Sequence, residues 1–253
     1  MISLEHITVT ADDRKILDDV SFQVGTGETK VMLGPSGAGK SSLLKIVLGL
    51  WRPDAGSVRV DGIEITRLSE REQMPIRRRM SMVFQGNALF DSLTVGENVG
   101  FFLREHSDMR DGEVNDRVDE CLDFVNLPGT KDLLPEEISG GMKKRVAIAR
   151  AIAFYPEIIL YDEPTTGLDP INAKTVTELI MKLKRERRVT SVVVTHILRD
   201  AFAVGDSLAL INEGAIVFDG PAAALLASPD PFVQNFLSEI REEASLLSPT
   251  LPL

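Results

Sequence analysis

A glycine-rich segment near the start of the chain has the residue types and the spacing needed to hold a phosphate group. Residues 34–41 read Gly-Pro-Ser-Gly-Ala-Gly-Lys-Ser and match the pattern Gly-x-x-x-x-Gly-Lys-Ser/Thr. Glycines let backbone N–H groups turn inward around a phosphate, and the N-terminus of the helix that follows adds favourable partial charge. Lys40 can reach the β- and γ-phosphates, and Ser41 can ligate Mg²⁺. The segment predicts nucleoside triphosphate binding and by itself leaves a kinase or a GTPase open. The residues expected to contact the nucleotide here are Gly34, Pro35, Ser36, Gly37, Ala38, Gly39, Lys40, Ser41 and Ser42.

Two adjacent acidic residues follow an apolar segment much later in the chain. Asp162 and Glu163 come directly after residues 158–161, which read Ile-Ile-Leu-Tyr. Asp162 is placed to hold Mg²⁺, and Glu163 extends beyond it, where it can orient an attacking water or take its proton. His196 follows another apolar segment, and we expect its imidazole to face the same crevice. Adjacent acids before Pro164 can also cap a helix, and that alternative stays open.

A third segment predicts a second anion site. Residues 138–145 read Ile-Ser-Gly-Gly-Met-Lys-Lys-Arg and open an apolar-periodic helix. Ser139 is expected to cap this helix, and Gly140 and Gly141 to let a ligand approach the backbone closely. A capped N-terminus can bind an anion, although a capped helix needs no ligand. Two such sites far apart in one chain indicate that the second serves a nucleotide bound by a neighbouring chain.

The elements that must position these residues belong to an α/β fold. Residues 30–33, 158–161 and 191–195 are apolar or β-branched almost throughout, as in central strands of a parallel sheet covered by helices on both faces. Candidate site residues follow each of them, where the carboxyl ends of such strands lie. Alternation over 20–24 and a hairpin pattern over 58–65 predict an N-terminal antiparallel β subdomain. The expected class is a P-loop NTPase (RecA-like) core with a mostly parallel sheet, followed by a last hairpin over 208–218.

The middle third of the chain predicts an inserted helical subdomain at about 87–155. Val114, Val118, Cys121, Leu122 and Val125 lie at helical spacing in a charged background. Cys121 lies on that apolar stripe, so we interpret it as a core residue and not as a reactive thiol. A short amphipathic helix is expected from Asp230 on. The predicted layout is one domain over 1–237 and a short tail over 238–253.

Composition limits the function classes. The 253 residues fit one α/β unit, and 43% apolar with 26% charged residues excludes a disordered chain. The 28 basic and 38 acidic residues leave a net charge of −10, which argues against nucleic acid as a partner. A single cysteine excludes an intrachain disulfide and a multi-cysteine metal site. We expect neither a signal peptide nor a membrane-spanning segment.

Taken in order, the motifs resemble those of the nucleotide-binding subunit of an ATP-binding cassette (ABC) transporter. The resemblance covers residues 2 to about 220. The matching segments are residues 34–41 (Walker A), Gln85 (Q-loop), residues 139–142 (signature, with Met where Gln is commoner), residues 158–163 (Walker B), residues 166–169 (D-loop) and His196 (switch histidine).

The resemblance implies a head-to-tail homodimer that hydrolyses ATP. Two ATP molecules would lie between Walker A of one chain and Ser139, Gly140 and Gly141 of the other, and Asp169 would tie the two sites together. Gln85 would sense Mg²⁺ and the γ-phosphate and link to the membrane subunit. Lys40 and His196, with Mg²⁺, would stabilise charge during hydrolysis, and Glu163 would act on the water. The implied cofactors are ATP and Mg²⁺, with Ser41, Gln85 and Asp162 as metal ligands.

Within that family, residues 77–90 and 98–106 resemble the ATPase of the MCE-type lipid transporters, which include the bacterial maintenance-of-lipid-asymmetry (Mla) system. This resemblance implies phospholipid transport between membranes, integral membrane permease subunits, a periplasmic MCE protein, and a peripheral location at the cytoplasmic face of the inner membrane. The alternatives are the ATPase of an importer for amino acids or another polar solute, and a soluble non-transport ABC ATPase. The basic runs 77–79 and 143–145 are interpreted as solvated surface in preference to phosphate or permease contacts.

One departure from the family concerns the base. The family places an aromatic residue before the Walker A loop to stack on adenine, whereas the aligned residue here is Ala11, beside Asp12 and Asp13. Arg14 could stack its planar guanidinium on a base instead. The sequence therefore leaves adenine recognition unassigned.

Overall fold

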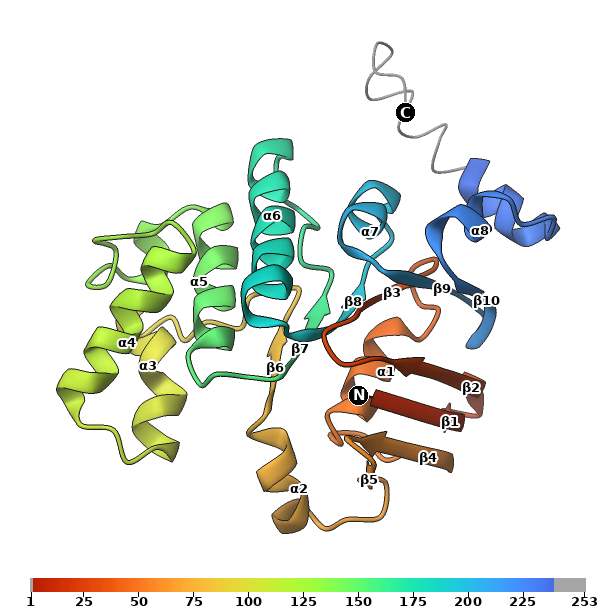
Figure 1. Cartoon of the computed structure of the whole chain (residues 1–253), viewed down its shortest axis with the longest axis horizontal. Helices are drawn as coiled ribbons and strands as arrows, with labels where there is room; N and C mark the ends of the chain where they lie inside the picture. The colour runs from red at the N-terminus through yellow and green to blue at the C-terminus, as the bar shows by residue number, and fades with distance from the viewer. Residues whose placement is uncertain (1, 239–253) are drawn as a thin grey trace.

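The computed structural model describes residues 2–238 and contains two β-sheets (Figure 1). Of the expected tail, 238–253, only the first residue lies within the described part. The larger sheet has the strand order β10-β9-β3-β8-β7-β6. Its strands are β3 (Thr29–Leu33), β6 (Met80–Val83), β7 (Ile158–Asp162), β8 (Thr190–Val194), β9 (Ser207–Asn212) and β10 (Ala215–Gly220). All neighbouring pairs are parallel except β9 and β10, which form the expected last hairpin.

The smaller sheet is antiparallel and has the order β2-β1-β4-β5. Its strands are β1 (Ile2–Ala11), β2 (Arg14–Val24), β4 (Ala55–Val60) and β5 (Ile63–Glu64). Asp61 and Gly62 both have positive φ, 49° and 79°, at the turn between β4 and β5. Two such residues are what a two-residue type I′ hairpin turn requires. The N-terminal antiparallel β subdomain is therefore confirmed.

The central strands supply two hydrophobic cores, one on each face of the larger sheet. In β3, Val31 and Leu33 pack into the core with α5 (Gly140–Ile152), α6 (Pro170–Arg187) and α7 (Leu198–Val204). Met32, between them, packs into a second core with α1 (Lys40–Val47) and the antiparallel sheet. Figure 1 shows α6 and α7 on one side of the sheet and α1 on the other. Burial on both faces explains why the central strands are mostly apolar and show no alternation of polar and apolar residues.

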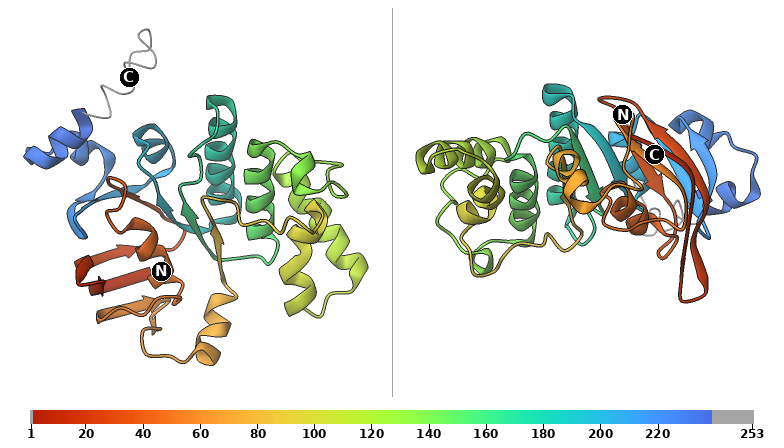
Figure 2. Two further views of the ribbon diagram at one scale, coloured as in Figure 1. Left: turned by 180° about the vertical axis from the view of Figure 1, so that it is seen from behind. Right: turned by 90° about the horizontal axis from the view of Figure 1, so that it is seen from below.

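The helical subdomain lies between β6 and β7, as expected. It contains α3 (Val95–His106), α4 (Asp111–Phe124), the 3₁₀ turn η1 (Pro135–Glu137) and α5 (Gly140–Ile152). These helices lie beyond the β6 edge of the sheet, at the far left of Figure 1 and the far right of the reversed view in Figure 2. Cys121 is fully buried in α4, and burial raises the pKa of its thiol to about 11. The interpretation of Cys121 as a core residue is confirmed.

Three further helices complete the described chain: α2 (Glu70–Arg77), α8 (Ala222–Leu226) and a helix over 231–238. None of the helices described between residues 2 and 238 is long and apolar enough to cross a bilayer. Asp230 accepts hydrogen bonds from the backbone of Phe232 and Val233, 2.8 and 3.1 Å. Val233 and Leu237 are buried, so the expected amphipathic helix is present.

The interpretation of residues 77–79 as solvated surface is wrong for Arg77, and Arg79, although 38% exposed, is held by ion pairs. Arg77 donates to the carbonyl oxygens of Leu48 and Gly49, 3.0 and 2.6 Å, and holds the turn after α1. The guanidinium of Arg79 pairs with Asp61 and Glu157 and joins the two sheets. These partners are distant in sequence, so a run of basic residues could not reveal them.

Candidate nucleotide-binding site

The phosphate-loop segment forms a tight turn between the end of β3 and the start of α1. Gly34 has φ 152° and Gly39 has φ 96°, both in the region that favours glycine. A Cβ on Gly34 would lie 2.3 Å from the Ile211 carbonyl oxygen, and one on Gly39 would lie 2.6 Å from that of Ile16. The loop is therefore pressed against β9 and β2, and no side chain fits at either glycine.

Lys40 folds back over this loop. Its ammonium group donates to the carbonyl oxygens of Gly34 and Pro35, 2.8 Å each, and the residue is only 6% exposed. Burial lowers the pKa of Lys40, and the charges of Glu163 and Asp162 offset part of that change. Lys40 and the two acids, which are more than 120 residues apart in the sequence, therefore lie in one cluster. Residues 35–37 of the loop beside this cluster are exposed.

The start of α1 and the end of β7 meet through a side-chain hydrogen bond. Ser41 Oγ donates to Asp162 Oδ1 at 2.8 Å. A hydroxyl and a carboxylate oxygen in contact suit Mg²⁺, which keeps several waters and takes few protein ligands. No group of three His, Cys, Asp or Glu side chains gathers in the described part of the chain. A metal bound here would thus complete its shell with water and nucleotide phosphate oxygens.

Glu163 is held by two side chains from different segments. His196 Nδ1 lies 3.0 Å from Glu163 Oε1, and Thr166 Oγ1 donates to Glu163 Oε2 at 2.8 Å. The Glu163 side chain is 11% exposed and that of His196 is 52% exposed. His196 therefore faces the same crevice as the acids, as expected, and it reaches Glu163 from the solvent side. The next helix, α6, begins at Pro170 and is capped by Asp169, so the acids do not cap a helix.

The backbone of Glu163 is the least expected feature of the site. Its φ is 47°, in the left-handed region, which carries a strain of about 1–3 kcal/mol for a residue with a side chain. A backbone hydrogen bond from Glu163 N to Val194 O, 3.0 Å, holds this conformation. The sequence analysis does not predict that Thr166 contacts Glu163. The one indication in the sequence is that this hydroxyl residue follows Glu163 by only three positions.

Gln85 lies on an exposed loop that follows β6 at the same edge of the sheet. β6 pairs with β7, so the residues after Val83 lie beside Asp162. The described contact of Gln85 is through its main chain, because its carbonyl oxygen accepts a hydrogen bond from Lys144 Nζ at 2.8 Å. Lys144 is 2% exposed, and burial lowers the pKa of its ammonium group to about 8.

Two of the three basic side chains of residues 143–145 are therefore not solvated surface. Lys144 also donates to the carbonyl oxygen of Phe84, 3.1 Å, and Arg145 donates to those of Val125 and Asn126, 3.3 and 2.9 Å. The interpretation from the sequence is wrong for these two residues. Main-chain carbonyls are the acceptors, and no pattern of acidic residues marks them.

Ser139 caps α5, as predicted, by accepting from the backbone of Met142 at 3.3 Å. The two glycines that follow differ in their surroundings. Nothing lies within 4 Å of a Cβ on Gly140, whereas one on Gly141 would lie 2.3 Å from Asn172 Cγ. Gly140 therefore leaves room for a ligand, and Gly141 lets α5 pack against the start of α6.

Asp169 lies next to this contact. It caps α6 by accepting from the backbone of Ile171 and Asn172, 3.0 Å each, and from the side-chain amide of Asn172. Asn172 thus touches both Asp169 and Gly141. Ser139, Gly140 and Asp169 are all exposed, and no hydrogen bond joins them to the phosphate loop within residues 2–238.

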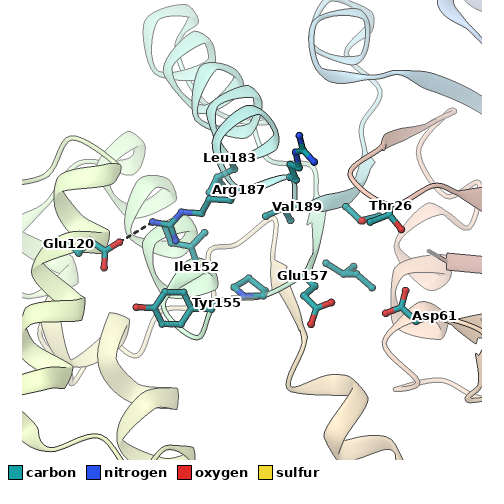
Figure 3. Close-up of a pocket in the computed structure, with 13 residues that line it drawn as sticks. Thr26, Asp61, Glu120, Ile152, Tyr155, Glu157, Leu183, Arg187 and Val189 are labelled. Atoms are coloured by element: carbon teal, nitrogen blue, oxygen red, sulfur yellow. Dashed lines mark hydrogen bonds and ion pairs between the residues drawn. The ribbon is translucent and has the colours of Figure 1, made fainter.

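One hollow of the described chain lies away from this site. A cavity of about 570 Å³ lies between the ends of α5 and α6, near Tyr155, Glu157 and Arg187 (Figure 3). Its lining includes Ile158 and Thr190, the first residues of β7 and β8. Asp162 ends β7 and His196 follows the end of β8, so the hollow lies at the opposite edge of the sheet.

The predicted base contacts lie on the turn between β1 and β2. Ala11 pairs with Arg14 across this turn, and Arg14 is exposed. Two residues further along β2, Ile16 touches Gly39 of the phosphate loop. The turn therefore adjoins the loop, and stacking of Arg14 on a base stays a prediction.

Fold and site together define a P-loop nucleoside triphosphatase. The glycine loop, Lys40, the Ser41–Asp162 pair and Glu163 converge at the carboxyl edge of a parallel sheet, where such folds bind ligands. The start of α5, which Ser139 caps and where Gly140 leaves room for a ligand, lies elsewhere on the surface. The signature, Q-loop and D-loop segments mark one family within this class.

Comparison with known proteins identifies that family. The ABC transporter family matches residues 17–166. The probable ribonucleotide transport ATP-binding protein mkl of Mycobacterium leprae is 40% identical over 237 residues, which are 94% of this chain and 68% of that protein. The intermembrane phospholipid transport system ATP-binding protein MlaF of Haemophilus influenzae is 38% identical over 94% of this chain and 90% of that protein.

Solved structures agree. A dimeric ATP-binding cassette in a post-hydrolysis state, bound to ADP and Pi, has a TM-score of 0.81 and 34% identity over 87% of this chain and 98% of that one. The chain belongs to the ABC transporter family and is an ATP-hydrolysing cassette that uses ATP and Mg²⁺. The resemblance drawn from the motifs is confirmed. For mkl of Mycobacterium tuberculosis the chain spans 66% of the relative's length.

Proposed function

We propose that this chain is the ATP-hydrolysing subunit of an ABC transporter that moves phospholipid between membranes. The observation that carries the proposal is the 38% identity to a phospholipid transport ATPase over 94% of this chain and 90% of that protein. The segments 77–90 and 98–106 resemble the same group. In such an assembly the chain would dock peripherally on integral permease subunits at the cytoplasmic face of the inner membrane, and a periplasmic MCE protein would complete the system.

The hydrolytic unit we propose is a head-to-tail homodimer. A related cassette forms a dimer with bound ADP and Pi. In the single chain Ser139 and Gly140 are exposed, and Gly140 has open space around its Cα. An anion-binding helix end that faces solvent suits a nucleotide delivered by a second copy. The domain layout we propose is one cassette over 1–237 with the helical insert, and a tail over 238–253.

In the proposed mechanism, the site residues act from the positions described above, except that Lys40 moves. Lys40 turns from the loop carbonyls to the β- and γ-phosphates, and exposed backbone amides of the loop surround them. Ser41, Asp162 and Gln85 would hold Mg²⁺, which when bound neutralises charge on the phosphate oxygens. Glu163 orients the water and takes its proton. Thr166 and His196 fix the carboxylate, and His196 also stabilises charge on the phosphate.

The rival is import of a polar solute, because the mycobacterial relative is named for ribonucleotide transport. The test is affinity purification of the full chain from detergent-solubilised membranes, followed by identification of bound proteins and lipid. An MCE protein with phospholipid supports the proposal. A permease that copurifies with a soluble solute-binding protein and no MCE protein overturns it.

A further inference from the structure

Two basic side chains of α5 grip the loop that carries Gln85. Lys144 Nζ donates to the carbonyl oxygens of Phe84 and Gln85, 3.1 and 2.8 Å. Arg150, further along the same helix, donates to those of Asn87 and Ala88, 2.8 and 2.6 Å. Four carbonyl groups between residues 84 and 88 are therefore held by one helix. We call residues 84–88 the gripped loop.

The surroundings of Lys144 indicate more than a packing role. Lys144 is 2% exposed, although it carries a charge. Removal of a charge from water is costly unless the charge is well paired, and an apolar residue at this buried position would avoid that cost. Among the described residues Lys144 has no ion-pair partner within 4.0 Å. The charge is instead satisfied by loop carbonyls, with Asp162 close enough to raise its pKa.

The gripped loop has few constraints of its own. Gly86 has no atom within 4 Å of its Cβ position, and Asn87 and Ala88 have left-handed φ values of 64° and 52°. Its internal hydrogen bonds are two short turns, Asn87 N to Phe84 O and Ala88 N to Gly86 O, 3.0 and 2.8 Å. The position of the loop is thus set mainly by α5.

The start of α5 and the gripped loop are expected to contact two different nucleotides. The proposed function, on which this inference rests, places the partner's ATP at Ser139 and Gly140, where α5 begins, and the chain's own Mg²⁺ near Gln85. We propose that Lys144 is a positioning residue, supported by Arg150, that makes the gripped loop move with α5. Engagement of the partner's ATP by α5 then sets the position of Gln85 at the chain's own site.

The first test measures hydrogen exchange at the amides of Asn87 and Ala88 in the full chain without nucleotide. Lys144→Met keeps the length of the side chain and removes its charge and its donors. We expect exchange at these amides to be about tenfold faster, as for loss of a charge-assisted hydrogen bond. Lys144→Arg should restore slow exchange. The matched control is Lys182→Met, since Lys182 also donates to a main-chain carbonyl, that of Phe124 at 3.3 Å.

The second test measures ATP hydrolysis by the same variants. We expect Lys144→Met to lower kcat about tenfold and to leave KM for ATP within about twofold, because Lys144 touches the gripped loop and not the phosphate loop. Lys182→Met should match the wild type in both constants. Equal exchange in Lys144→Met and Lys182→Met, or a rise in KM as large as the fall in kcat, overturns the inference.

The outcomes separate this inference from the function it rests on. If the wild type hydrolyses ATP and Lys144→Met behaves like it, the inference fails alone. If the wild type does not hydrolyse ATP, the proposed function fails, and the exchange measurement still decides whether Lys144 holds the loop.

Discussion

Substitution of Glu163 by glutamine tests the catalytic assignment most directly. Gln keeps the size of the side chain and an oxygen that accepts from Thr166, whose hydroxyl is 2.8 Å from Glu163 Oε2. The variant loses the negative charge and the capacity to take a proton. A positioned general base contributes about 10²–10⁴-fold to rate, which is about 3–5 kcal/mol at about 1.4 kcal/mol per tenfold. We expect turnover of Glu163→Gln to fall by that factor.

The assay pairs phosphate release at saturating ATP and Mg²⁺ with equilibrium ATP binding and gel filtration. Binding should stay within about threefold of wild type, about 0.7 kcal/mol, because Lys40 and the phosphate loop are unchanged. The variant should accumulate as an ATP-bound dimer. Near-normal turnover would remove Glu163 from its role.

Thr166→Val serves as the matched control for this experiment. It keeps the carboxylate of Glu163 and removes one neutral hydrogen bond to it, a loss of about 0.5–1.5 kcal/mol, or about two- to tenfold in rate. Equal losses in Thr166→Val and Glu163→Gln would show that placement of the side chain, and not proton transfer, limits the reaction.

Four further predictions concern the dimer, the base (two predictions) and the core. Mixing Lys40→Ala chains with Ser139→Arg chains creates one intact composite site, so the mixture should hydrolyse ATP faster than either variant alone; if Ser139→Arg matches wild type, the shared site is wrong. Without an aromatic platform, ATP and GTP should bind within about tenfold of each other, about 1.4 kcal/mol, and a preference above about a hundredfold would contradict this. Arg14→Ala should weaken ATP binding more than pyrophosphate binding, and equal losses would make Arg14 a phosphate contact. Burial raises the pKa of Cys121 from 9.0 to about 11, so above about pH 9 the unfolded chain loses its proton first, and the free energy of unfolding should fall by about 1 kcal/mol between pH 8 and pH 10. Urea unfolding of wild type and Cys121→Ala checks this, and an equal fall in both would exclude the thiol as its source.

The sequence alone determined the features that depend on neighbouring residues. The glycine spacing of residues 34–41 and the cap at Ser139 are local, because turn and cap geometry are set within a few residues. Unbroken apolar runs identified the central strands, since burial on both faces leaves no polar alternation. Glu163 and His196 each follow a predicted parallel strand, so the sequence placed both at the same edge of the sheet. The structure confirms that the two side chains are in contact.

Only the tertiary structure decided the contacts between distant segments. Lys144 lies 60 residues from Phe84 in the chain, and its carbonyl acceptors carry no side-chain signature. The basic run around Lys144 therefore predicted a solvated side chain, whereas in the structure Lys144 is buried and donates to the carbonyl oxygens of Phe84 and Gln85. Gly141 faces Asn172, so it serves helix packing in addition to any ligand. The left-handed backbone of Glu163 is likewise imposed from outside, by Val194 on the neighbouring strand, because a residue with a side chain does not favour that conformation by itself.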